Sequence, residues 1–156
     1  MKITAYDLAK RFDGKIKEIP GADDHPLVVF MLQLAARSRW PDADEIPWCS
    51  AFVYFIAFLL DLRRPHEKGL RARSWLLVGD RINLLSAERG NDIVVLKRGG
   101  GNQPGPDVVN AKGHVGFLDK FDGGDVLVLG GNQSNAVNVS RYPIEKILSI
   151  QRLYWE

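Results

Sequence analysis

Residues 51–60 (AFVYFIAFLL) form the longest uninterrupted apolar stretch of the chain, and the only cysteine, Cys49, stands just before it. A helix of this composition is apolar on every face, which is typical of a helix packed inside a core rather than on a surface. Ten such residues are too few to span a bilayer. We therefore predict a buried helix with Cys49 in its first turn.

The residues before this stretch favour a reactive thiol. Pro47 suits a first-turn position, and Asp44 and Glu45 complement the positive end of the helix dipole. Unpaired backbone N–H groups in a first turn stabilise a thiolate, so we expect the pKa of Cys49 to lie below the ordinary thiol value of about 8.5. The alternative is that Cys49 is a small buried hydrophobe, the usual state of a lone cysteine in apolar surroundings.

Length and charge narrow the class of protein. The 156 residues fit one domain, taken as residues 1–156, which can bury a core without disulfides or metals. With 21 basic and 19 acidic residues, the net charge of +2 is too balanced to indicate a nucleic-acid partner. The N-terminus has no apolar run that would form a signal or an anchor. We expect a monomer that is synthesised in the cytoplasm and does not bind membranes.

The first half of the chain has the pattern of helices. We predict them over residues 4–13, 27–36 and 72–78, in addition to the helix of Cys49. Asp23 and Asp24 can cap the second helix. His25, next to Pro26, and His66, in a charged loop, fit capping or surface roles better than catalysis.

The second half of the chain has the pattern of strands. β-Branched and alternating segments, separated by glycine-rich turns, occur at residues 92–97, 113–121, 125–129, 136–142 and 147–154. Helices followed by strands indicate an α+β fold with a C-terminal antiparallel sheet. Residues 99–112 are rich in glycine and proline, and we expect them to form a mobile rim of a cleft, without regular hydrogen bonds, that a protease cuts first.

A hairpin in this half brings two polar side chains together. If Asp122, Gly123 and Gly124 form a three-residue loop, His114 lies directly opposite Asn132, within reach of an imidazole-to-amide hydrogen bond. A two-residue loop or a bulge would shift this register by one residue. Asn132 is also suited to a turn, because asparagine tolerates left-handed backbone.

Four segments together resemble a known family. Residues 44–53 (DEIPWCSAFV), 72–76 (ARSWL), 113–117 (GHVGF) and 129–133 (LGGNQ) are similar to the papain-like cell-wall hydrolases of the CHAP and NlpC-type superfamily. They most resemble a single-domain branch found among phage lysins. The resemblance covers about residues 25–153 and implies a papain-like fold, with N-terminal helices packed on the antiparallel sheet.

The resemblance also implies roles for particular residues. It makes Cys49 the nucleophile, His114 the base and Asn132 the polar third member of the site. Residues that could contact substrate or the oxyanion are Trp48, Ser50, Trp75, Gly113 and Gln133. One departure is Gly130, because many CHAP proteins have a glutamate two residues before that asparagine.

The implied activity is hydrolysis of a peptidoglycan amide through a cysteine thioester, by an amidase or endopeptidase. No cofactor is expected, and no metal, because His25, His66 and His114 stand in unrelated contexts without ligand spacing. A phage lysin and a toxin delivered between cells both fit this activity. Two alternatives remain, namely a thiol acyltransferase of the same fold and a catalytically silent wall-binding module.

Overall fold

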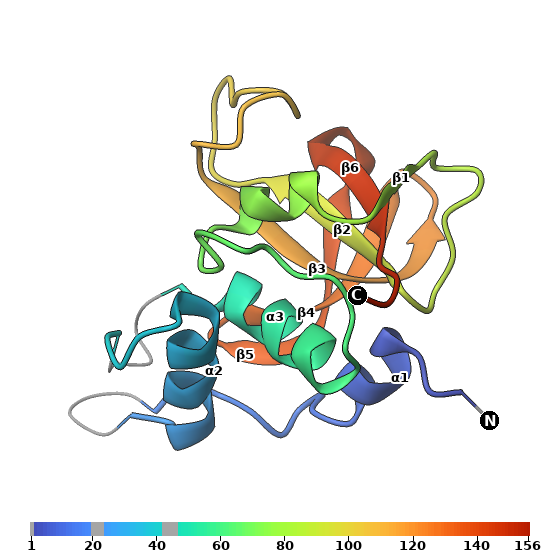
Figure 1. Cartoon of the computed structure of the whole chain (residues 1–156). Coiled ribbons are helices and arrows are strands. Elements are labelled where there is room, and N and C mark those ends of the chain that lie inside the picture. The colour runs from blue at the N-terminus through green and yellow to red at the C-terminus, as the bar shows by residue number, and fades with distance from the viewer. Residues whose placement is uncertain (1, 20–23, 42–46) are drawn as a thin grey trace.

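The structure is a computed structural model that describes residues 2–19, 24–41 and 47–156. A six-stranded antiparallel sheet has the strand order β1-β6-β2-β3-β4-β5, and helices α1, α2 and α3 lie together on one side of it (Figure 1). The predicted α+β class is therefore confirmed, as is the order of helices before sheet. Asp23, Asp44 and Glu45, for which capping or dipole roles were predicted, lie outside the described residues.

The elements follow the predicted pattern closely. The helices are α1 (Ala5–Lys10), α2 (Pro26–Ala36) and α3 (Cys49–Leu59), with the 3-10 helices η1 (Ala72–Leu77) and η2 (Ile144–Lys146). The strands are β1 (Asp80–Ile82), β2 (Asp92–Lys97), β3 (Gly113–Asp122), β4 (Asp125–Gln133), β5 (Ala136–Pro143) and β6 (Ile147–Arg152). The sequence analysis missed β1, whose three residues are too short to show a periodicity.

Helix α2 begins at a histidine rather than at an aspartate. His25 is the N-cap, and its Nδ1 accepts a hydrogen bond from the backbone N–H of Leu27 at 3.2 Å. Pro26 occupies the first helical position, where its missing N–H leaves nothing unpaired. The predicted capping role of His25 is thus confirmed, and the predicted cap at Asp24 is wrong.

Helix α3 forms the centre of the helical layer. It begins at Cys49, as predicted, but Trp48 is its N-cap, so Pro47 lies outside the helix and not in its first turn. Every residue from 49 to 57 is buried, and the helix packs between α2 and strands β3 and β4. Among the described residues, no helix is long and apolar enough to cross a membrane.

The sheet is apolar on both faces. Alternate residues of a strand point to opposite faces, so Ile93 and Val95 join the core beneath α3, where the rings of Phe52 and Phe117 meet edge to face at 6.2 Å. The intervening residues of β2 belong to a second apolar cluster, formed by Val94, Leu96, Leu118, Val126, Val128 and Ile150. Strand β3, which carries His114, is therefore held from both sides.

The β3–β4 hairpin differs from the predicted three-residue loop. Asp122 pairs with Asp125, so the loop has two residues, and Gly123 has the positive φ of 61° that such loops favour. A register shift between Leu118 and Lys120 then restores the predicted pairing deeper in the sheet, where Phe117 faces Leu129. The predicted loop is wrong, but the shift cancels its effect on the register.

A buried arginine organises the loop at residues 99–112. Arg73, on η1, is fully buried, and its guanidinium donates hydrogen bonds of 2.8–2.9 Å to four backbone carbonyls, those of Pro104, Gly105, Val108 and Lys112. The second half of this loop is therefore held to η1 by side-chain hydrogen bonds, while residues 99–112 form no helix or strand. The sequence does not indicate this role of Arg73, because the loop is held by one distant side chain and not by periodic backbone hydrogen bonds.

We predict that Arg73→Met loosens this loop. Loss of the guanidinium leaves four carbonyls without their donor, which should lower the free energy of unfolding by about 3 kcal/mol. Thermolysin should then cut within residues 99–112 much faster than in the wild type. Lys112→Met, which removes an exposed cation from the same loop, is the control and should change neither cleavage nor melting. Equal cleavage of both variants would show that Arg73 does not hold the loop.

Candidate active site

The structure brings Cys49 and His114 together at the junction of the helical layer and the sheet. Cys49 is the first residue of α3, and His114 is the second residue of β3, against which α3 packs. The thiol and the imidazole lie close enough that each shifts the pKa of the other. Both side chains are nearly covered, with 4% and 8% of their surfaces exposed. The pair is therefore shielded from bulk water, which strengthens its electrostatic interaction.

Gln133 holds the other side of the imidazole. Its Oε1 lies 2.9 Å from His114 Nε2, while its amide Nε2 donates to the carbonyls of Val128 at 3.1 Å and Asn138 at 2.7 Å. These two acceptors fix the amide orientation, so only the oxygen can face the ring. His114 Nε2 must then carry a proton and donate, which leaves Nδ1 to interact with the thiol.

Tyr142 adds a second contact to the same oxygen. Its hydroxyl donates to Gln133 Oε1 at 3.0 Å, and its ring lies over the imidazole with centroids 5.4 Å apart. Burial, together with the negative charge of Cys49, raises the pKa of Tyr142 to about 12. The hydroxyl therefore remains a donor near neutral pH. The sequence analysis did not identify Tyr142, because β5 carries no motif that marks it.

Asn132 does not occupy the predicted position beside the imidazole. Within the described part of the chain its side chain makes no hydrogen bond, and its backbone is left-handed with φ of 56°. The pairing of β4 with β5 shifts between Gly130 and Gln133, so the next residue turns its amide toward His114. The predicted His114–Asn132 contact is therefore wrong, and the turn interpretation of Asn132 fits its backbone. The glycines before it were the available signal for a bulge.

The electrostatics favour a charged pair. Burial raises the pKa of the Cys49 thiol, but the hydrogen bond and positive charge of His114, the N–H of Val115 and the charge of Arg98 outweigh it, so the net direction is downward. Burial lowers the pKa of His114, but the hydrogen bond and charge of Cys49 and the contact with Gln133 raise it overall. A thiolate beside an imidazolium is the form that attacks carbonyl groups.

Three of the predicted substrate contacts have structural roles instead. Trp48 is fully buried and donates its indole N–H to Glu18 at 2.6 Å. Ser50 donates to the carbonyl of Gly69 and accepts the indole N–H of the buried Trp75 at 2.8 Å. These side chains fix the start of α3 against η1 and the chain near Glu18, and they cannot reach a substrate without unpacking.

The glycines around the site permit close packing. A Cβ on Gly113 would lie 2.8 Å from Arg73 Cγ, and one on Gly131 would lie 2.7 Å from the Trp48 ring. A Cβ on Gly130 would lie 2.9 Å from Gln133 Oε1. The glutamate that many CHAP proteins have at the position of Gly130 would therefore displace the amide that orients His114 here.

The other histidines lie apart from this site. His25 caps α2, and His66 lines a separate pocket. No group of three or more His, Cys, Asp or Glu side chains is placed to hold a metal ion in residues 2–19, 24–41 or 47–156. The groups that meet at the candidate site are a thiol, an imidazole and an amide.

Comparison with solved structures finds chains that are similar to this one. No family model and no curated protein sequence matches the chain. Among solved structures, the chain is similar to NlpC1 from Trichomonas vaginalis, with 18% sequence identity and a TM-score of 0.48. The match covers 96% of this chain and 43% of that one, so this chain spans less than half the length of the NlpC1 chain.

We predict different effects for the two neighbouring amides. Gln133→Ala removes the acceptor that favours the imidazolium, so the pKa of Cys49 should rise and alkylation in mildly acidic buffer should slow about tenfold. Asn132→Ala should leave alkylation unchanged but lower the free energy of unfolding by about 1 kcal/mol, because alanine resists left-handed backbone. Asn132→Gly should restore that stability. Slower alkylation in Asn132→Ala would return the orienting role to Asn132.

We also predict the pH dependence of the thiol. The rate of Cys49 alkylation by iodoacetamide follows the thiolate fraction, so it should rise as the pH passes a pKa below the ordinary thiol value of about 8.5. In His114→Gln the imidazolium is absent while burial persists, so the inflection should move to at least that value. An inflection at the ordinary value in the wild type would contradict the charged pair.

Proposed function

We propose that the protein is a cysteine-dependent amidase or peptidase that hydrolyses an amide bond of peptidoglycan. The observation that carries this proposal is the arrangement of His114, whose Nε2 is fixed by Gln133 and whose remaining nitrogen is available to the Cys49 thiol. A nucleophile, a base and a group that orients the base are the parts that acyl transfer requires.

In the acylation step, the Cys49 thiolate attacks the carbonyl carbon of the amide. The negative charge passes to the carbonyl oxygen, which the backbone N–H of Cys49 can stabilise, because the first N–H groups of a helix have no partner within it. His114 then gives the Nδ1 proton to the departing nitrogen, the C–N bond breaks and a thioester remains. Gln133 keeps the ring oriented by accepting from Nε2 throughout.

In the deacylation step, His114 is neutral and accepts a proton from water as the water attacks the thioester. The C–S bond breaks, the acid product leaves and the thiolate–imidazolium pair is restored. The neutral amide of Gln133 orients the imidazolium but stabilises its charge less than a carboxylate would. The low exposure of the pair limits access to a substrate segment that can extend into the junction between α3 and the sheet.

Peptidoglycan as the substrate is supported by the sequence segments around Cys49 and His114 that resemble cell-wall hydrolases. We propose that the protein reaches the wall after release, as a lysin does, or by delivery between cells. It needs no cofactor for the steps described. An amide bond of the stem peptide or the bond between muramic acid and L-alanine would meet the same chemistry.

The test is digestion of purified peptidoglycan with analysis of the fragments by mass spectrometry. The wild type should release fragments with a new amine and a new carboxyl group, which identify the bond cleaved. Cys49→Ala and His114→Ala should each lose at least about a thousandfold in rate with unchanged melting, a loss typical of nucleophile and base removal. Iodoacetamide should abolish activity and EDTA should not.

The same experiment separates the alternatives. Transfer of the acyl group to an added amine in preference to water would indicate an acyltransferase. A thiol that iodoacetamide does not label at neutral pH, in a protein that binds but never cuts the wall, would indicate a silent binding module. Full activity of folded Cys49→Ala would overturn the proposal.

A further inference from the structure

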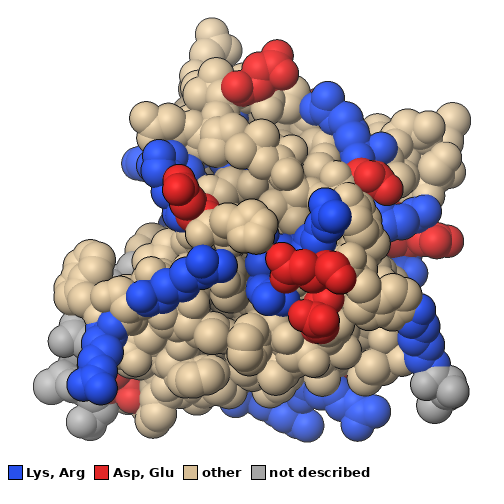
Figure 2. All heavy atoms as spheres, viewed as in Figure 1, with Lys and Arg blue, Asp and Glu red and all other residues tan. Residues whose placement is uncertain are grey.

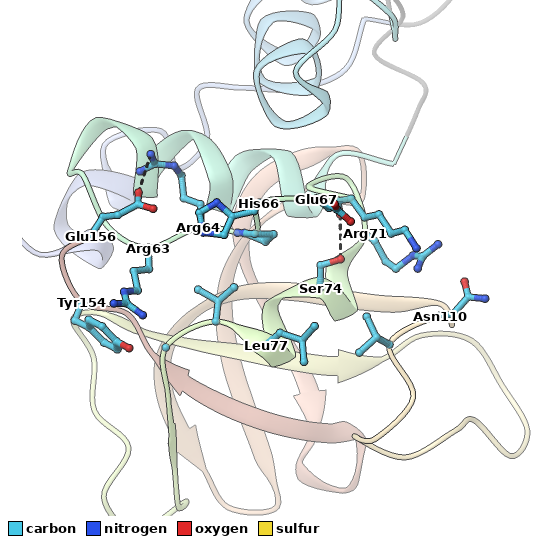
Figure 3. A pocket seen from close by; sticks show the side chains of 15 residues that line it. Arg63, Arg64, His66, Glu67, Arg71, Ser74, Leu77, Asn110, Tyr154 and Glu156 are labelled. Atoms are coloured by element: carbon cyan, nitrogen blue, oxygen red, sulfur yellow. Dashed lines mark hydrogen bonds and ion pairs between the residues drawn. The ribbon is translucent and has the colours of Figure 1, made fainter.

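A cavity lies beside η1, and Cys49, His114 and Gln133 are not among the residues that line it. Its volume is about 720 Å³, within the range of small-ligand pockets. The walls come from residues 63–68, from η1 and the residues just after it, from the 99–112 loop, and from the C-terminal segment. In Figure 3, Arg63 and Tyr154 lie toward one end, Arg71 and Asn110 toward the other, and Leu77 lies between them.

The period of η1 separates this cavity from the active site. A 3-10 helix has three residues per turn, so Arg71, Ser74 and Leu77 share one face, and all three line the cavity. Ala72 and Trp75 share the next face, which packs toward Gly113 and Ser50 beside the catalytic pair. The cavity is therefore a separate site that uses the same short helix.

The walls of the cavity are fixed without a ligand. Val109 and Asn110 belong to the loop whose carbonyls the buried Arg73 holds. At the other end, Arg64 forms a 3.2 Å salt bridge with Glu156 and donates to the carbonyls of Ala57 and Leu62. A ligand would therefore meet a preformed surface and would not need to order it, which favours binding.

The cavity presents free positive charge around an apolar floor. Arg63, Lys68 and Arg71 form no ion pair with an acidic group among the residues that the structure describes, and Arg63 lies over the Tyr154 ring at 4.7 Å. The side chain of Leu77 is 77% exposed, so it offers apolar surface that a ligand could cover. Cations at both ends of an apolar floor fit a ligand with separated anionic groups and an apolar side chain between them.

We propose that this cavity binds a short acidic peptide, with carboxylates at the two cationic ends and an apolar side chain on Leu77. Glu67 and Glu156 also line the cavity, and their charge disfavours the dense negative charge of a polyphosphate. Figure 2 likewise shows basic and acidic side chains interspersed over this face of the molecule, not one large basic patch. The proposal deepens the proposed function by giving the enzyme a second peptide site, but its geometry does not depend on catalysis.

The test is calorimetric titration of folded Cys49→Ala with two synthetic peptides, acetyl-Glu-Ala-Leu-Ala-Glu-amide and its counterpart with glutamine in place of glutamate. The acidic peptide should bind at least tenfold more tightly, because each carboxylate gains a charged hydrogen bond. Arg63→Gln and Arg71→Gln should each weaken its binding about tenfold. Leu77→Ser should weaken both peptides.

The controls keep this test independent of the proposed hydrolysis. Arg11→Gln removes an exposed arginine at the C-cap of α1, which does not line the cavity, and should bind the acidic peptide as its parent does. Equal binding of the two peptides, or unchanged binding in Arg63→Gln and Arg71→Gln, would overturn the proposal. Binding by a protein that never cuts peptidoglycan would leave the peptide site standing and the proposed function refuted. Cutting of peptidoglycan by a protein that does not bind the acidic peptide would support the proposed function and refute the peptide site.

Discussion

The candidate site depends on one side-chain amide whose orientation is fixed. Gln133 places both of its N–H donors on backbone or side-chain oxygens of β4 and β5, so its oxygen must face His114 and the hydroxyl of Tyr142. This orientation of the Gln133 amide determines the tautomer of the imidazole and the direction of its free nitrogen, and it favours the charged form of the Cys49 thiol. A buried amide can orient an imidazole in this way without the desolvation cost of a buried carboxylate.

Close packing at glycines and single buried polar side chains connect the elements around the site. Glycines let β4 approach the start of α3, where Trp48 and Phe52 fill the space that a side chain on Gly131 would need. The hydroxyl of Ser50 joins α3 to Trp75 of η1, and the guanidinium of Arg73 joins η1 to a loop that has little side-chain packing of its own. Each connection uses a single buried polar side chain whose nitrogen or oxygen atoms all have hydrogen-bond partners, as buried polar groups require.

The sequence was sufficient for most of the helices and strands but not for the residue that orients His114. The apolar run after Cys49 is stable only when it is buried in the core, so α3 and its first residue could be predicted. Strand period and turn residues likewise predicted β2 to β6 to within a few residues. Asn132 was placed beside His114 because a regular ladder was assumed, whereas a register shift after Gly130 presents Gln133 instead. Side-chain hydrogen bonds such as those of Arg73 and Tyr142 leave no periodic trace, because they depend on side-chain geometry and not on the period of a helix or strand.

The three-residue period of η1 gives the molecule a length constraint. Each residue of a 3-10 helix turns about 120°, so inserting or deleting one residue between Arg71 and Leu77 would rotate every later side chain onto the wrong face. Trp75 would leave Ser50, and Leu77 would leave the cavity wall. Homologous chains can therefore vary the composition of this segment. Only an insertion or deletion of three residues, one whole turn, would keep the later side chains on their faces. Alignments of such chains should show gaps on either side of η1 and, inside it, only gaps of three residues.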